Sequence, residues 1–246
     1  MHKTVFLWIF LLGLGLTTTT ALHAQATLPG RIVLARVTPD VTVTNKATGE
    51  TKTAVNAMEI AQNYSVTTGR AGSVVLVFSN GSTINLKQDS VLDIEQYLQD
   101  PLEAAFEPEK ATNEPTVSNT KLNLTRGELV GNVKKLNKAK NSSFSVQTPV
   151  GAAGIRGTTF RIVYRPDPVS GRYNFTLTTL EGNVQLTVAS GTVSAPPVSV
   201  TDNKEVVITN VEVNVTNNQV TATTATLNCR ITASMVGLGN VDNTLD

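Results

Sequence analysis

Histidine, tryptophan and cysteine are almost absent from this 246-residue sequence, which contains two His, one Trp and one Cys. His2, His23 and Trp8 all lie within the first 26 residues. If that segment is removed, no imidazole remains for a Ser/His or Cys/His nucleophile pair or for a His-ligated metal. Cys229 alone excludes an internal disulfide, and we expect it to be a small buried residue, with an intermolecular disulfide as the alternative. Only carboxylate-based catalysis remains, and no pair of acids stands out as placed for it, so we expect no enzyme, no bound metal and no cofactor.

Residues 1–26 have the pattern of a Sec-type signal peptide. Lys3 precedes an apolar run from Val5 to Leu16, and the segment ends in Ala24-Gln25-Ala26, which favours cleavage after Ala24 or Ala26. As a helix, the apolar run would rise about 18 Å, which is short of the roughly 30 Å hydrocarbon core of a membrane. We expect a bacterial protein that is exported to the periplasm or beyond, with no membrane span after signal removal.

The charges balance in number but are segregated along the chain. Removal of Lys3 leaves 19 basic and 19 acidic residues, which argues against nucleic acid as a partner. Eight acids lie between Asp89 and Glu114, and ten bases lie between Lys121 and Arg172. One interpretation is two solvated surfaces. The other is that the acidic segment folds onto the basic half, or that one patch meets a partner.

Short strands separated by turn residues dominate the rest of the sequence. Thr, Val, Ile and Asn are frequent from Arg31 to Leu98, with Pro or Gly about every ten residues, which is typical of sandwiches and β-solenoids. Residues 96–119 read as a long acidic, Pro-rich loop, with one helical turn near 102–106. The segments LTRGELVGNV and LTTLEGNVQLTV resemble each other and suit stacked coils. We expect an all-β fold, either a compact β-solenoid or β-roll or a sandwich, with residues 191–246 as a C-terminal β extension and loose tail.

The run SVVLVFSNGSTINLKQ predicts a β-hairpin. Asn80-Gly81 favours a type I′ turn, in which both residues have positive φ. The strand at 74–78 is apolar on both faces and is expected to be buried on both. The strand at 83–86 is apolar on one face only, so we expect it to lie nearer the surface.

The glycine-rich stretch TPVGAAGIRGTTFRI is the most specific motif in the chain. Gly151, Gly154 and Gly157 have the spacing GxxGxxG rather than GxGxxG, and a strand follows instead of a helix, which argues against nucleotide binding. Pro149 is expected to end a strand. The glycines would allow a compact corner in which the Arg156 guanidinium donates to neighbouring carbonyls or a carboxylate.

Three separated elements resemble those of the FecR family, a periplasmic domain first defined in iron-dicitrate sensing. The matching residues of the glycine-rich element are Thr148, Pro149, Gly151, Gly154, Arg156, Gly157, Thr158 and Phe160. An earlier element ends at Asn80 and Gly81, and the closing element TTLEGNVQLTV contains Glu181 and Gly182. The resemblance covers residues 31–189 and implies a FecR-like all-β domain, over residues 27–190, that transmits or scaffolds rather than catalyses.

The expected function is a non-catalytic envelope module that binds a protein or polymer partner. The best-known FecR members resemble anti-sigma regulators with a cytoplasmic region and one membrane span, so an accessory role in signalling with an outer-membrane receptor is the alternative. A third possibility, a carboxylate-dependent glycan-active enzyme, would need two acids flanking a cleft at roughly 5 to 10 Å.

Overall fold

The structure is a computed structural model that describes residues 28–102, 111–190, 193–194, 196–216 and 219–233. The expected signal peptide, most of the helical turn near 102–106 and the residues after 233 lie outside this range. The backbone alone is described from 212 onwards, so the environment of the Cys229 side chain also lies outside it.

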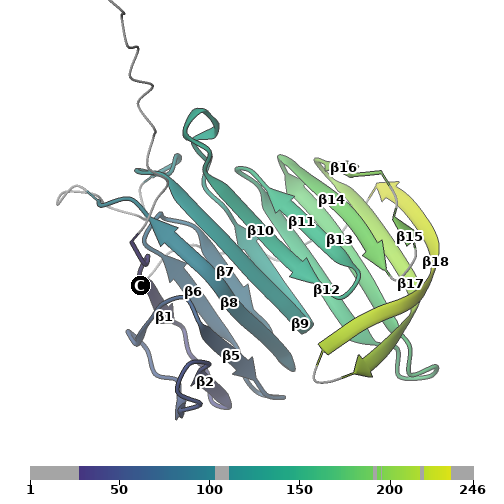
Figure 1. The fold of residues 1–246 in the computed structure, drawn as a ribbon, viewed down its shortest axis with the longest axis horizontal. Coiled ribbons are helices and arrows are strands. Elements are labelled where there is room, and N and C mark those ends of the chain that lie inside the picture. The colour runs from purple at the N-terminus through teal and green to yellow at the C-terminus, as the bar shows by residue number, and fades with distance from the viewer. Residues whose placement is uncertain (1–27, 103–110, 191–192, 195, 217–218, 234–246) are drawn as a thin grey trace, which may run out of the picture.

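The described chain is almost entirely β-strand, which confirms the all-β prediction (Figure 1). In layer 1 the strands lie in the order β3 (Thr51–Thr53), β2 (Val41–Asn45), β5 (Tyr64–Thr68), β8 (Ser90–Gln99), β9 (Ser118–Asn132), β10 (Ser143–Thr148), β11 (Gly151–Ile155), β14 (Asn183–Ser190) and β16 (Val198–Thr201). In layer 2 they lie in the order β4 (Glu59–Ile60), β1 (Ile32–Ala35), β6 (Val74–Phe78), β7 (Thr83–Leu86), β9, β12 (Thr159–Pro166), β13 (Tyr173–Glu181), β17 (Lys204–Thr216) and β18 (Gln219–Ala233). Strand β15 (Val193–Ser194) pairs with the end of β14, and η1 (Lys138–Lys140) is a 3₁₀ turn.

Strand β9 belongs to both layers, so the strands form one continuous sheet folded on itself. Its first half pairs with β8 and β10 in layer 1, and its second half, from Gly127, pairs with β7 and β12 in layer 2. After β9, two-stranded hairpins alternate between the layers: β10–β11, β12–β13, β14–β16 and β17–β18. Figure 1 shows the strands side by side from β1 to β18. Arches therefore join the layers at the ends of the strands.

The core lies between the two layers. The strands alternate buried and half-buried residues, as expected when one face of each layer is turned inward. The Phe78 ring of β6 packs edge-on against Tyr97 of β8 and Phe144 of β10, with centroid distances of 5.0 and 5.9 Å, and both contacts cross between the layers. Phe160 is fully buried and lies over Gly131, where a Cβ would approach its ring to 2.4 Å.

The prediction of unequal burial for the two strands of the SVVLVFSNGSTINLKQ hairpin was wrong. Val75 and Val77 on the outer face of β6 are only half-buried, because that face has no second layer over it. Ile84 and Leu86 of β7 are fully buried, since β7 lies between β6 and β9 inside layer 2.

The Asn80-Gly81 turn exists, but it is not of type I′. Gly81 has a φ of 86°, whereas Asn80 has no positive φ. The Phe78 N–H donates to the Ser82 carbonyl (2.9 Å) and the Gly81 N–H donates to the Phe78 carbonyl (2.8 Å), which defines a three-residue loop with a glycine bulge. Asn80 is fully buried, and its Oδ1 accepts the Ser82 N–H at 2.9 Å. Asn80 is thus buried in a turn of a different type from the one that the Asn-Gly dipeptide favours.

Candidate functional site: a row of turns around Arg156

One end of the strands carries a series of adjoining turns, which we call the turn row. It consists of the β6–β7 loop (79–82), the segment after β9 (133–137), the β11–β12 arch (156–158), the β13–β14 arch (181–182) and the β16–β17 arch (202–203). Seven of the residues singled out by the sequence lie in it: Asn80, Gly81, Arg156, Gly157, Thr158, Glu181 and Gly182. Elements of the sequence motif that are far apart in the chain therefore meet at one edge of the fold.

Hydrogen bonds connect each turn of this row to the next. They run from the Lys134 N–H to Ser82 Oγ (3.2 Å), between the Val133 and Thr158 main chains (3.0 Å each way), from Thr158 Oγ1 to the Asn183 carbonyl (3.1 Å) and from the Gly182 N–H to the Asp202 carboxylate. The bonds of Ser82 and Thr158 are partly buried and that of Gly182 is exposed, and together they fix the turns relative to one another. The turn row is thus a preformed surface.

Two glycines of the motif allow these turns to approach closely. Gly157 has a φ of 74° and Gly182 a φ of 91°. A Cβ at Gly182 would lie 2.8 Å from the Gly157 carbonyl oxygen, and a Cβ at Gly157 would lie 2.9 Å from the Lys135 side chain. Both the conformation and the lack of space therefore require glycine.

The expectation that the Arg156 guanidinium donates to neighbouring carbonyls or a carboxylate was wrong. Its side chain is exposed, and it forms no hydrogen bond or ion pair with another residue of the described chain. Ile155 is fully buried, so strand alternation turns the next residue outward. The neighbouring Lys135 is also exposed. Lys134 is half-buried, and this burial lowers the pKa of its amino group. Arg156 is an exposed cation on a fixed arch.

The remaining motif residues lie elsewhere. Thr148, Pro149 and Gly151 form the β10–β11 turn at the opposite end of the strands, where Thr148 Oγ1 donates to the Gly151 carbonyl at 3.1 Å. A Cβ at Gly151 would lie 2.2 Å from the Thr187 carbonyl oxygen of β14. Gly154 lies on the outer face of β11. The glycine-rich stretch is therefore not a single site.

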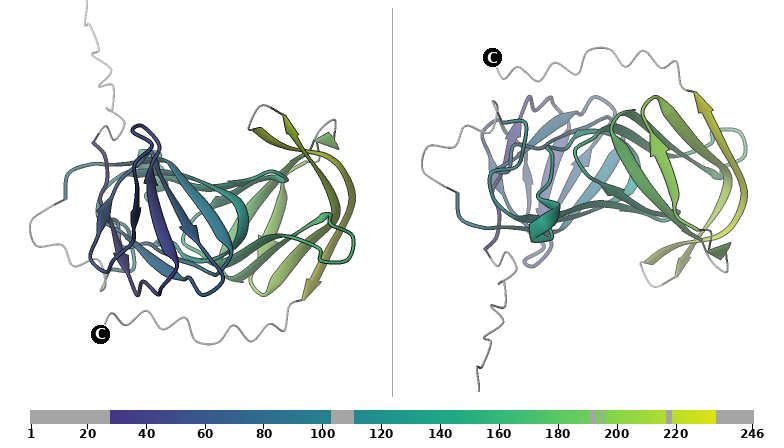
Figure 2. Two further views of the ribbon diagram at one scale, coloured as in Figure 1. Left: turned by 90° about the horizontal axis from the view of Figure 1, so that it is seen from below. Right: turned by 90° about the horizontal axis from the view of Figure 1, so that it is seen from above.

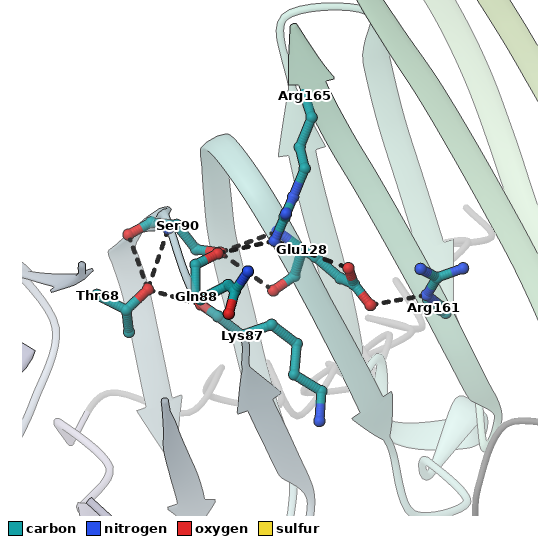
Figure 3. Close-up of polar contacts among 7 residues, drawn as sticks. All are labelled: Thr68, Lys87, Gln88, Ser90, Glu128, Arg161 and Arg165. Carbon is teal, nitrogen blue, oxygen red and sulfur yellow. Dashed lines mark hydrogen bonds and ion pairs between the residues drawn. The ribbon is translucent and has the colours of Figure 1, made fainter. Parts of the chain in front are cut away.

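At that opposite end, a polar cluster that the sequence did not indicate joins the arches of β5, β7, β9 and β12 (Figure 3). Its bonds run from Thr68 Oγ1 to the Lys87 carbonyl (2.6 Å), from Ser90 Oγ to the Gln88 carbonyl (3.0 Å), from the Glu128 N–H to Ser90 Oγ (2.9 Å) and from Arg165 Nη2 to the Gln88 carbonyl (2.7 Å). Arg161 and Arg165 approach the Glu128 carboxylate to 2.8 and 3.7 Å. Most of these groups bond to one another, so their contribution is to hold the arches together, although Arg165 Nε is buried without a hydrogen-bond partner.

A second buried network supports the turn row from behind. The Tyr97 hydroxyl accepts the Asn80 N–H at 3.0 Å and donates to Gln99 Oε1 at 2.8 Å. Burial raises the pKa of Tyr97 to about 12. The hydroxyl therefore stays protonated at neutral pH and can keep its donor role.

Glu114 connects the acidic segment to the basic half of the chain. The residue is 7% exposed, and its carboxylate accepts the Ser118 hydroxyl at 2.7 Å and the Asn137 N–H at 2.6 Å. The contact reaches the main chain of the lysine-rich segment rather than a lysine side chain, and no ion pair joins Asp100 or Glu114 to Lys134, Lys135 or Lys140. Among the described residues, the two charged regions meet through main-chain pairing of residues 112–114 with Lys135 and through the buried Glu114 side chain.

No group of three or more His, Cys, Asp or Glu side chains is placed to hold a metal within the described ranges. Nor does the part of the chain that the structure covers contain a helix long and apolar enough to cross a membrane.

Two crystal structures of a candidate anti-sigma factor from Parabacteroides distasonis ATCC 8503 are similar to this chain. They share 14% and 13% sequence identity with it, with TM-scores of 0.42 and 0.40. Each alignment covers 64% of this chain and 58% of the solved chain, so this protein matches less than two thirds of those structures. No curated protein matches the sequence significantly.

The sequence profile of the family described as FecR protein matches residues 64–194. That range is more than half of the chain and runs from β5 to β15, including the Arg156 and Gly182 arches and the Asn80-Gly81 loop. The chain belongs to the FecR family.

Proposed function

We propose that this protein is a non-catalytic, exported module that binds a protein or polymer partner in the bacterial cell envelope through the turn row around Arg156. Membership of the FecR family supports a binding or transmitting role rather than a catalytic one. The N-terminal sequence pattern supports export.

The observation that carries the proposal is the position of Arg156. The motif that builds the arch is held by hydrogen bonds and glycine contacts, yet the arginine makes no bond within the described structure. An exposed guanidinium on a rigid arch loses little conformational freedom when it binds a carboxylate or phosphate bidentately. Lys135 on the adjoining turn adds positive charge. These features suit recognition of an acidic group on a partner.

Arg156→Ala should therefore weaken partner capture about tenfold or more, because arginines at interface centres often dominate binding. The mature protein would be immobilised and exposed to envelope extract, and bound protein and polymer would be quantified by mass spectrometry and sugar analysis. The free energy of unfolding should change by no more than about 0.5 kcal/mol, since the residue is exposed.

Arg126→Ala is the matched control. Arg126 is also exposed, but it lies at the opposite end of the strands, at the β9 bend. It should bind as the wild type does. Equal capture by wild type and Arg156→Ala, or equal losses for both variants, would contradict binding at the turn row.

Export has its own test. Trp8 is the only tryptophan in the chain, so protein recovered from the periplasm or medium should show almost no fluorescence when excited at 295 nm. Its intact mass should correspond to a chain that begins near Gln25 or Thr27. A full indole signal from that fraction would show that the segment is retained.

Family membership also favours a second function, an accessory role in envelope signal transduction with an outer-membrane receptor. Photo-crosslinkers at Lys135 and Glu181, both exposed on the turn row, would distinguish the two. Crosslinks to a receptor would support signalling, whereas crosslinks to a structural polymer or another envelope protein would support the scaffold role.

A further inference from the structure

The β17–β18 hairpin ends in a strand with an open edge. Strand β18 pairs with β17 and with no other described strand, although it also packs near β14 of layer 1. In β17, residues up to Val211 pair with β13 as well, whereas residues 212–216 pair with β18 alone. Figures 1 and 2 show this hairpin as the border of the fold at its C-terminal end. Its distal part is therefore a two-stranded ribbon, an arrangement that is marginally stable in water without a further strand.

The β18 edge lacks the features that normally prevent edge pairing. The run from Gln219 to Cys229, QVTATTATLNC, contains no Lys, Arg, Asp, Glu, Pro or Gly. Charged residues, prolines and very short strands are the usual protection against association at sheet edges. Bulges in the β17–β18 pairing lie between Val207 and Val213 and leave the stretch facing Gln219–Ala222 regular.

The other edges of the two layers are protected. Strand β3 has three residues, including Lys52, and β4 has two, including Glu59. Strand β16 has four residues and directly follows Pro196-Pro197. Within the described chain, β18 is thus the long edge that carries no such protection.

We propose that the β18 edge pairs antiparallel with the β18 edge of a second copy of this chain, giving a joint sheet of β17 and β18 from each copy. A two-fold axis through an antiparallel pair joins identical strands without requiring complementary charges, and the uncharged run satisfies this condition. Pairing with Ala222 of one copy opposite Ala222 of the other places Thr221 opposite Thr223. It also places Arg230 of each copy beyond Gln219 of the other, so like charges do not face each other. A four-stranded sheet also gives the distal ribbon the further strands that it lacks.

The test combines sedimentation with hydrogen exchange of the mature protein. Sedimentation should show a concentration-dependent dimer, and amide exchange in the peptide 219–229 should slow as the concentration rises through the dimerisation range. The double variant Thr221→Lys/Thr223→Lys introduces facing lysines at the edge, so it should weaken dimerisation at least tenfold and abolish the concentration dependence of exchange. Circular dichroism should show that the variant retains its strand content.

Thr201→Lys places the same substitution on the short, exposed edge strand β16 and should dimerise as the wild type does. Arg156→Ala should also retain the dimer, which separates this inference from partner binding at the turn row. A wild-type protein that remains monomeric up to about 100 μM, or a dimer unaffected by the Thr221→Lys/Thr223→Lys change, would overturn the proposal.

Discussion

Gly127→Ala should lower the free energy of unfolding by about 3 kcal/mol or more, because two independent effects oppose a side chain there. The φ of Gly127 is 106°, a region that costs a non-glycine residue about 1–3 kcal/mol. A Cβ would also lie 2.1 Å from Ser90 Oγ and 2.4 Å from Ser90 Cα. Ser90 is fully buried and bonded to Thr68, so it cannot move away without breaking that contact. Urea denaturation followed by circular dichroism would measure the loss.

Gly154→Ala is the matched control for the same chemical change. Gly154 lies on the outer face of β11, and a Cβ there would meet only the Gln185 carbonyl oxygen, at 3.7 Å. Its substitution should alter the free energy of unfolding by no more than about 0.5–1 kcal/mol, and in the stabilising direction, since alanine loses less backbone freedom than glycine. Similar losses for the two variants would show that the packing around Gly127 is not the cause.

The sequence pattern around Gly127 was recognised as a repeat, but it did not predict the arch that Gly127 forms. The similarity of LTRGELVGNV and LTTLEGNVQLTV proves to reflect two arches between layers, at Gly127 and Gly182, each with a positive φ. The pattern did not show that one strand, β9, continues from layer 1 into layer 2 through the arch at Gly127. That depends on pairing with strands up to 49 residues away, such as Thr83 of β7 with Asn132, which lies outside any local window.

The prediction for the Arg156 side chain failed for a different reason. The alternation of Ala153 and Ile155 as inward residues would have turned Arg156 outward, so local periodicity was sufficient to predict its exposure. The expectation of bonds to carbonyls instead rested on the glycine-rich corner and on the several donors of the guanidinium. For Asn80, local sequence was not sufficient. The Asn-Gly dipeptide correctly predicted a turn, but Asn80 is buried and bonded to Tyr97 and Ser118, and the turn is not of type I′.

Glu114 could not have been identified from the sequence, because its partner Asn137 lies 23 residues away, after β9. Glu114→Ala should lower the free energy of unfolding by about 2–4 kcal/mol, since it leaves the buried Ser118 hydroxyl and the partly buried Asn137 N–H without an acceptor. The Ser118 hydroxyl also accepts from Asn80 Nδ2 at 3.0 Å, so the loss extends to the loop that begins the turn row.

Glu114→Gln tests whether the second acceptor oxygen matters. One amide oxygen can still accept the Asn137 N–H, but the amide nitrogen then faces Ser118, whose hydroxyl must turn and lose its own acceptor. The expected loss is about 1–2 kcal/mol, intermediate between alanine and wild type. Glu50→Ala, which removes only an exposed ion pair with Lys52 at 3.1 Å, should cost less than about 0.5 kcal/mol. If chemical denaturation gave equally small losses for Glu114→Ala and Glu50→Ala, the carboxylate would not be what fastens the acidic segment to the lysine-rich turn. The rigidity of the turn row would then depend on its other hydrogen bonds.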